Sequence, residues 1–165
     1  LPIVSQYHSQ LFPDLHLRNE DMRLYDETAC RYAIEKIYVC WSKINCNPGD
    51  IVCVYRMADY YKTYRSVVTG IGIIQEILYI YNEEDFVKEC KNKSVFTESE
   101  LRDLFRVKGY RTIIKTLFVE GFENKLNLKS LRDNGILGPN DAPKLNTFLT
   151  KQSFELLKKL GRTDR

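Results

Sequence analysis

The 165-residue sequence lacks any apolar run of the roughly 18 to 20 residues that a membrane-spanning helix needs. Its first residues, LPIVSQYHSQ, also lack the order of a signal peptide, in which a basic region precedes an apolar one. These two absences predict a cytoplasmic protein without a membrane partner. Because residue 1 is Leu1 rather than methionine, we allow for an excised domain of a longer protein.

Metal-binding residues are scarce or badly spaced. The two histidines, His8 and His16, stand eight residues apart with no acidic ligand set beside them. The five cysteines are an odd number, and no pair shows the C-x-x-C spacing of a zinc site, so we expect reduced and mostly buried thiols. We therefore assign no metal site and no cofactor.

The sequence motifs of common enzyme classes are also missing. There is no G-x-S-x-G nucleophile turn, and the GIG at 70–72 lacks the further glycine and the strand-to-helix context of a phosphate-binding loop. We assign no catalytic residue, and a non-catalytic protein is the favoured interpretation.

The overall composition is that of an ordinary soluble chain. Hydrophobic residues make up 44% and charged residues 28% of the sequence, which is enough to bury a core without disulfides or metals. The length predicts one domain. The net charge of +3 is compatible with a nucleic-acid partner but is too small to indicate one by itself.

The first half of the sequence is rich in strand patterns. Alternating apolar residues predict a strand at 34–41, and the turn sequence NCNPGD leads into a second apolar strand, IVCV at 51–54. These two strands are expected to form an antiparallel hairpin or a wide turn. A long, bent strand is predicted at 66–81, because glycines interrupt its β-branched run.

The second half is richer in helix signals. Asn82 followed by acidic residues begins one helix, and Thr97 with Glu100 three residues later forms the capping box of another. A strand is expected at 113–122, a short helix before Asn134, and an amphipathic helix at 150–160. Because strands and helices are segregated, the fold class is α+β, built on an antiparallel sheet or a small barrel.

Aromatic and basic residues gather at three places, namely 38–43, 54–56 and 59–66. Aromatic rings stack on exposed bases, and Arg or Lys binds phosphate, so this composition is typical of nucleic-acid binding. Simpler interpretations compete with it. Trp41 fits a core residue equally well, the tyrosines of 59–66 fit a solvated loop, and Arg56 and Arg65 fit surface ion pairs.

The segments AIEKIYVCWSKINCNPGDIVCVYR and YRSVVTGIGIIQEI resemble the PUA-like superfamily, which includes EVE, ASCH and YTH domains. The likeness is closest to the PUA-like module that follows a GNAT-type acetyltransferase domain in some bacterial proteins. It implies a small, bent antiparallel β-barrel with peripheral helices at 30–165, preceded by an N-terminal connector or extension at 1–29. It also implies a cleft that accommodates a nucleobase. The sequence departs from typical ASCH domains in lacking their G-x-K-x-x-E-x-R motif.

The leading hypothesis is a non-catalytic module that binds RNA or DNA and that can recognise a modified base. In this hypothesis aromatic residues stack on bases, cations bind phosphates and hydroxyls contact base edges. Trp41 and Tyr55 are assigned to stacking. Lys43, Arg56 and Arg65 are assigned to phosphate binding, and Ser42, Ser66 and Thr69 to the base edges.

Two alternatives remain open. The first is an ASCH-like hydrolase of a modified nucleoside, for which Lys43, Thr69 and Glu76 are the available residues; an extended strand would hold the last two on opposite faces, roughly 23 Å apart. The second is a regulatory interaction domain whose partner is an acetyltransferase domain of the same parent protein, with residues 1–15 as the connector.

Overall fold

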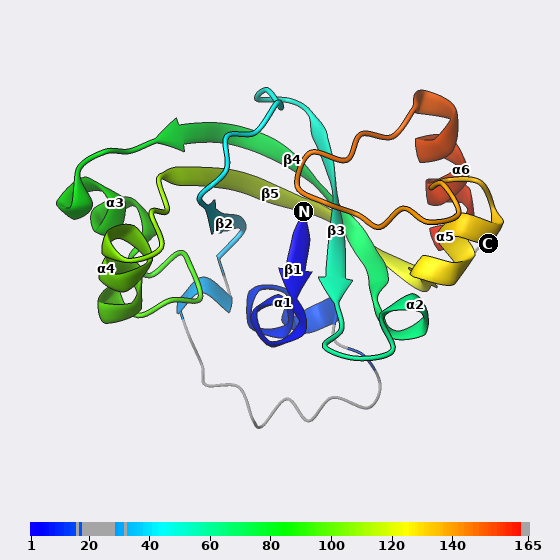
Figure 1. The fold of residues 1–165 in the computed structure, drawn as a ribbon, viewed down its shortest axis with the longest axis horizontal. Helices are drawn as coiled ribbons and strands as arrows, with labels where there is room; N and C mark the ends of the chain where they lie inside the picture. The colour runs from blue at the N-terminus through cyan, green and yellow to red at the C-terminus, as the bar shows by residue number, and fades with distance from the viewer. Residues whose placement is uncertain (16, 18–28, 32, 163–165) are drawn as a thin grey trace. The chain divides into compact units, whose positions relative to one another are not determined.

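The computed structural model describes residues 1–15, 17, 29–31 and 33–162, so His16 lies outside the described residues. The fold is α+β, as predicted (Figure 1). Five strands form one mixed sheet in the order β1-β3-β4-β5-β2. Their bounds are Pro2–Val4 (β1), Glu35–Cys40 (β2), Ile51–Met57 (β3), Val67–Tyr79 (β4) and Thr112–Asn127 (β5). Within the described part of the chain β1 and β2 are the two edges of the sheet, so closure into a barrel is not confirmed.

The chain divides into two compact units, and the long strands β4 and β5 each contribute to both. Unit 1 consists of Leu1–His8, Val52–Ile71 and Val119–Arg165. Unit 2 consists of Ser9–Ile51 and Gly72–Phe118. The boundary at 29/30 that the sequence suggested stays a prediction. Residues 2–4 belong to unit 1 because β1 pairs in parallel with β3, with Pro2 opposite Tyr55.

Unit 1 is built from β1, β3, the first part of β4, the last part of β5 and three helices. These helices are α2 (Lys62–Arg65), α5 (Leu128–Asp133) and α6 (Lys151–Gly161). Asn127 caps α5 and Thr150 caps α6, each accepting a backbone N–H two or three residues into the helix. The core consists of apolar side chains from these strands and helices, among them Tyr55, Val68, Phe122, Leu131 and Leu157.

Unit 2 is built around the antiparallel pair β2 and β5, with Glu35 opposite Leu117. Helices α3 (Glu83–Cys90) and α4 (Glu98–Arg106) pack on this pair through apolar side chains that include Ile37, Phe86, Leu101 and Ile113. The capping box predicted at Thr97 and Glu100 is confirmed. Helix α1 (Ser5–Leu11) and the short helices η1 (Pro13–Leu15) and η3 (Ala29–Arg31) complete the described elements.

The predicted hairpin between 34–41 and 51–54 is wrong. Strand β2 pairs with β5, whereas β3 lies between β1 and β4. The turn before β3 explains the difference. Gly49, at a φ of 94°, donates its N–H to the Ile74 carbonyl, and Ile74 donates back to the Asp50 carbonyl, at 2.8 and 2.9 Å. The turn therefore directs the chain toward β4 rather than back along β2.

The close approach of α6 to β5 gives a stability prediction. A Cβ added at Gly161 would lie 2.6 Å from the ring of Phe122, which is buried. Because a buried ring cannot rotate away, we expect Gly161→Ala to lower the free energy of unfolding by about 1 to 3 kcal/mol, measured by urea denaturation. Gly138→Ala is the matched control, since its new methyl meets only the end of the Asp141 side chain. Equal stability of the two variants would contradict this packing.

Candidate nucleic-acid interface

The connection between β3 and β4 is held in place by Ser66. Its buried hydroxyl accepts a hydrogen bond from the Ala58 backbone N–H at 3.0 Å, which closes the loop that carries α2. Its carbonyl accepts from the Leu128 N–H at 3.1 Å, where α5 begins. Ser66 therefore positions α2 and α5 together, and these two helices are in contact.

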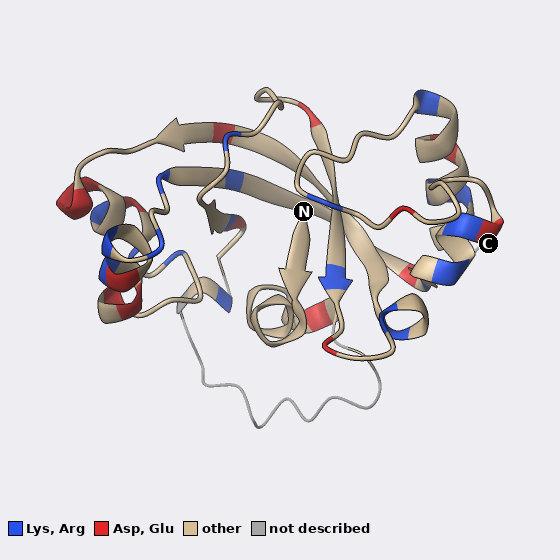
Figure 2. Cartoon of the chain, in the orientation of Figure 1, with Lys and Arg blue, Asp and Glu red and all other residues tan. Residues whose placement is uncertain are grey.

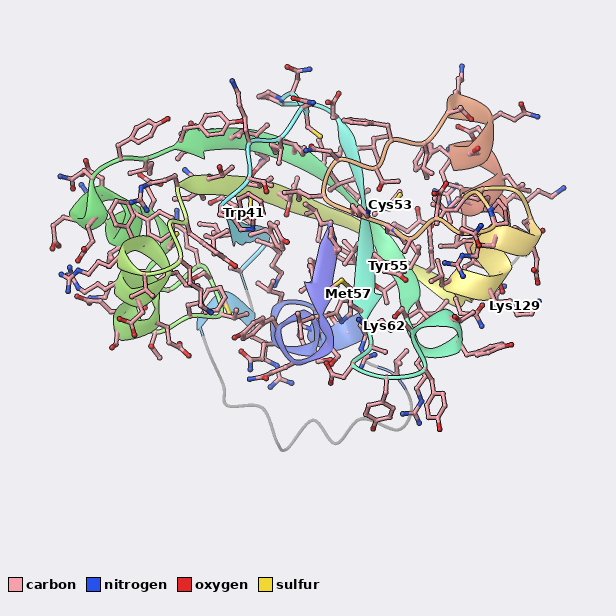
Figure 3. All side chains as sticks on the ribbon, in the orientation of Figure 1. Trp41, Cys53, Tyr55, Met57, Lys62 and Lys129 are labelled. Atoms are coloured by element: carbon pink, nitrogen blue, oxygen red, sulfur yellow. The ribbon has the colours of Figure 1, made fainter. Side chains whose placement is uncertain are left out.

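The contact of α2 with α5 brings Lys62 of α2 and Lys129 of α5 into the same part of unit 1 (Figure 3). Helix α5 contributes Lys129 and Arg132, which are three residues apart and so share a face of the helix. We call the whole group the α2–α5 patch, and its members are Tyr60, Tyr61, Lys62, Tyr64, Arg65, Lys129 and Arg132.

The cations of the patch differ in how they are held. Lys129 forms an ion pair with Asp133, whose hydrogen bond raises the pKa of that lysine, and the nearby Tyr64 adds to the rise. Arg132 donates from Nε to the Asp141 carbonyl at 2.9 Å. In the part of the chain that the structure describes, neither Lys62 nor Arg65 pairs with a carboxylate. Both are exposed and available to an anionic ligand.

The aromatic residues of the patch lie open to solvent. Tyr60, Tyr61 and Tyr64 are 63, 75 and 62% exposed. The rings of Tyr60 and Tyr61 are 5.9 Å apart and nearly perpendicular, at 79°. The Arg65 guanidinium lies over the Tyr60 ring at 5.1 Å, a cation–π contact. Two exposed rings and one exposed cation therefore lie in contact with one another at the start of α2.

Charge is distributed unevenly between the units. Unit 1 contains twelve lysines and arginines against seven aspartates and glutamates, an excess of five positive charges. Unit 2 contains thirteen against fifteen, a deficit of two, and together these give the net charge of +3. Figure 2 shows basic residues on α2, α5 and α6 of unit 1. The modest net charge of the sequence therefore conceals a basic unit.

The predicted site residues of β3 and β4 lie inside unit 1. Tyr55 is only 4% exposed; burial raises the pKa of its phenol, and a hydrogen bond with Ser66 partly offsets that rise. It lines an apolar cavity of about 60 Å³ with Cys53 and Val68. An engineered cavity that binds benzene measures roughly 150 Å³, so this cavity is smaller than one that holds a single ring.

Thr69 and Arg56 belong to a buried polar group that includes His8. The His8 Nε2 and the Thr69 hydroxyl are 2.8 Å apart, and the Thr69 hydroxyl donates to the Val54 carbonyl at 3.4 Å. A hydroxyl has one proton to donate, so it accepts from the Nε2–H of a neutral His8. Burial first, then the positive charges of Arg56 and Lys125, lower the pKa of His8 to about 3.

The other predicted site residues, Trp41, Ser42 and Lys43, follow β2 in unit 2. Trp41 is 70% exposed and so is not the core residue that the simpler interpretation allowed. Ser42 is half-buried and accepts at its carbonyl from the Cys40 thiol at 3.4 Å, while Lys43 is exposed. Unit 2 also has a cavity of about 400 Å³, which none of the predicted site residues lines. Its walls are Leu11, Phe12, Pro13, Asp14, Leu15, Arg31, Ala33, Ile34, Lys36 and Phe118.

The residues proposed for a hydrolase are engaged in other contacts. The Thr69 hydroxyl is buried and bonded to His8, as described above. The Glu76 carboxylate holds Lys115 at 2.8 Å, and Glu89 holds the same lysine at 3.0 Å. No contact of the described residues therefore supports this alternative, which stays a prediction.

The site predicted from the sequence includes Arg65 of the patch and its neighbour Ser66, but it lacks Lys62, Lys129 and Arg132. The pairing of Lys129 with Arg132 on one helical face was a usable signal, since both follow the Asn127 cap at helical spacing. The contact of α5 with α2 had no local signal, because it depends on the tertiary fold.

Three solved structures resemble the chain, all of the ASCH protein from Zymomonas mobilis. A serine-to-alanine variant matches with a TM-score of 0.57 and 16% identity, covering 80% of this chain and 87% of that one. A tyrosine-to-phenylalanine variant and the protein without a named substitution both match with a TM-score of 0.54 and 16% identity. Both matches cover 77% of this chain. They cover 84% of the tyrosine-to-phenylalanine variant and 81% of the protein without a named substitution.

The chain has an ASCH-like fold. This confirms the PUA-like resemblance at the level of the fold, while the closer likeness to an acetyltransferase-associated module is not confirmed. No family model and no curated protein matches the sequence.

The described residues contain no group of three or more His, Cys, Asp or Glu side chains arranged to hold a metal ion. No helix among them is both long enough and apolar enough to cross a membrane. All five cysteines are free thiols, and three of them, Cys30, Cys40 and Cys90, are buried.

The buried, neutral His8 predicts an acid-sensitive stability. The unfolded chain takes up a proton at the ordinary histidine pKa of 6.5, whereas folded His8 does so only near 3, so acid favours unfolding between these values. From pH 6.5 to 4.5 the native protein should lose about 2.3 kcal/mol more than a His8→Gln variant, measured by urea denaturation at each pH. Parallel stability profiles for the two proteins would show that His8 is not held neutral.

Proposed function

We propose that the protein is a nucleic-acid-binding module that uses the α2–α5 patch of unit 1. The observation that carries the proposal is the packing of α2 against α5, which places exposed cations beside exposed tyrosines on a unit with five excess positive charges. The ASCH-like fold is compatible with this role but does not itself identify a ligand.

The cations suit a phosphate backbone. Lys62 and Arg65 are exposed and unpaired with carboxylates in the described structure, so binding would not first have to break an ion pair. Lysine and arginine bind phosphates with the release of counterions, which makes the affinity depend steeply on salt. The first contact is therefore electrostatic and independent of sequence.

The proposal moves the stacking role from the interior to the surface. Tyr55 is buried beside a cavity smaller than one that holds a single ring, whereas the three tyrosines of the patch are mostly exposed. Exposed rings can stack on bases of any identity. Recognition of RNA over DNA, or of a modified base, stays a separate prediction, as do the roles of Trp41, Ser42 and Lys43.

A charge-removal experiment tests the patch. We expect Lys62→Ala with Arg65→Ala to weaken binding of a fluorescein-labelled single-stranded 12-mer RNA by about tenfold in 50 mM salt, measured by fluorescence anisotropy. The slope of log affinity against log salt should become less steep by roughly 0.7 for each lost phosphate contact. Lys88→Ala with Lys108→Ala removes the same charge from exposed positions of unit 2 and is the matched control.

The same titration is run with DNA of the same sequence and with RNA carrying a modified base. Absence of salt-sensitive binding to every probe would refute the proposed function. Equal losses in the patch and control variants would show that general charge, rather than the α2–α5 patch, attracts the ligand. Mass spectrometry of the recovered oligonucleotides and of added nucleosides checks the hydrolase alternative.

A further inference from the structure

Tyr61 has an unusual backbone conformation directly before α2. Its φ of 52° and ψ of 42° lie in the left-handed region, which glycine enters freely and a residue with a side chain does not. Asn92 is the other non-glycine residue with a positive φ in the described part of the chain, and asparagine tolerates this region. A tyrosine at such a position therefore requires an explanation that a structural turn alone does not provide, because glycine would make the same turn without strain.

The effect of this conformation is to present two rings in different orientations. Tyr60 and Tyr61 are adjacent in sequence, mostly exposed, and nearly perpendicular with their centroids 5.9 Å apart. Two perpendicular aromatic faces within one dipeptide are not needed for the core of unit 1, which neither ring enters.

We propose that Tyr60 and Tyr61 form a two-ring platform that stacks on consecutive unpaired bases, and that the left-handed backbone of Tyr61 is retained to hold this platform open. The inference rests on the proposed function and specifies its ligand class as a single-stranded nucleic acid.

The angle between the rings is what excludes a duplex. Successive bases in a duplex are stacked nearly parallel, so they cannot lie on two faces that differ by 79°. Unpaired bases can be splayed apart by rotation of the backbone and can each cover one ring. The exposed Arg65 guanidinium lies 5.1 Å from the centre of the Tyr60 ring, so a cation that can bind phosphate stands beside the ring that would stack on a base.

Substitution of Tyr61 separates the platform from ordinary structural roles. Tyr61→Gly removes both the strain and the ring, so we expect the Tm to rise by about 2 to 4 °C while the affinity for the single-stranded 12-mer falls about 5- to 50-fold. Affinity for the same RNA annealed to its complement should change by less than about twofold. Tyr61→Phe keeps the ring and should bind as the native protein does.

Two further variants keep the test decisive. Tyr60→Leu removes the other ring without altering the left-handed residue, and it should show the same selective loss even if Tyr61→Gly folds poorly. Tyr81→Leu replaces a tyrosine of unit 2 that is 81% exposed, and it should leave binding unchanged.

The outcomes distinguish this inference from the proposed function. Absence of binding by the native protein refutes both. Binding that Lys62→Ala with Arg65→Ala weakens, but that Tyr61→Gly and Tyr60→Leu leave intact, overturns the platform and retains the patch. Equal losses for single-stranded and duplex RNA in the tyrosine variants would also overturn the platform.

Discussion

The candidate interface depends on two hydrogen bonds made by Ser66. One closes the β3–β4 connection through Ala58, and the other fixes the start of α5 through Leu128. Both are buried, where an unsatisfied donor or acceptor would cost about 1 to 3 kcal/mol. The Ser66 hydroxyl thus closes the loop before α2, and the backbone carbonyl of the same residue holds the start of α5. The expected contact of Ser66 with a base stays a prediction, and its observed contacts position the loop and α5.

Inside unit 1 the same strands carry a polar interior. His8, Thr69 and Val54 form a chain of hydrogen bonds at the junction of α1, β4 and β3. Neutrality of the imidazole is what makes this burial tolerable, because Arg56 and Lys125 already supply positive charge nearby. These hydrogen bonds therefore tie α1, β4 and β3 together inside unit 1, whereas the candidate interface consists of the loop and helices that follow β3 and β5.

Local sequence patterns predicted most of the helices and strands. They did not predict which strands pair with one another, because pairing depends on the tertiary fold. The cap at Asn82, the capping box at Thr97 and the alternation at 34–41 placed elements within a few residues of their observed bounds. The partner of β2 could not be predicted, because nothing within residues 34–41 specifies the distant β5. β1 is only three residues long, which is too short for a periodic pattern to be legible.

The site was predictable only in part for the same reason. Arg65 and Ser66 lie in an aromatic and basic stretch that composition reveals directly. Lys129 joins them only after α5 packs on α2, and Trp41 was equally consistent with burial until the fold showed it exposed. The left-handed conformation of Tyr61 had no sequence signal at all, since tyrosine is not a residue that favours it.

The uneven division of charge has a consequence for how a ligand would arrive. A polyanion diffusing nearby experiences attraction from the basic unit and slight repulsion from the other, so productive collisions are selected before any short-range contact exists. This electrostatic steering raises the association rate and weakens as the salt concentration rises, whereas ring contacts affect the dissociation rate. In the proposed function, long-range charge and exposed rings therefore govern different steps, and Arg65, which lies over the Tyr60 ring, takes part in both.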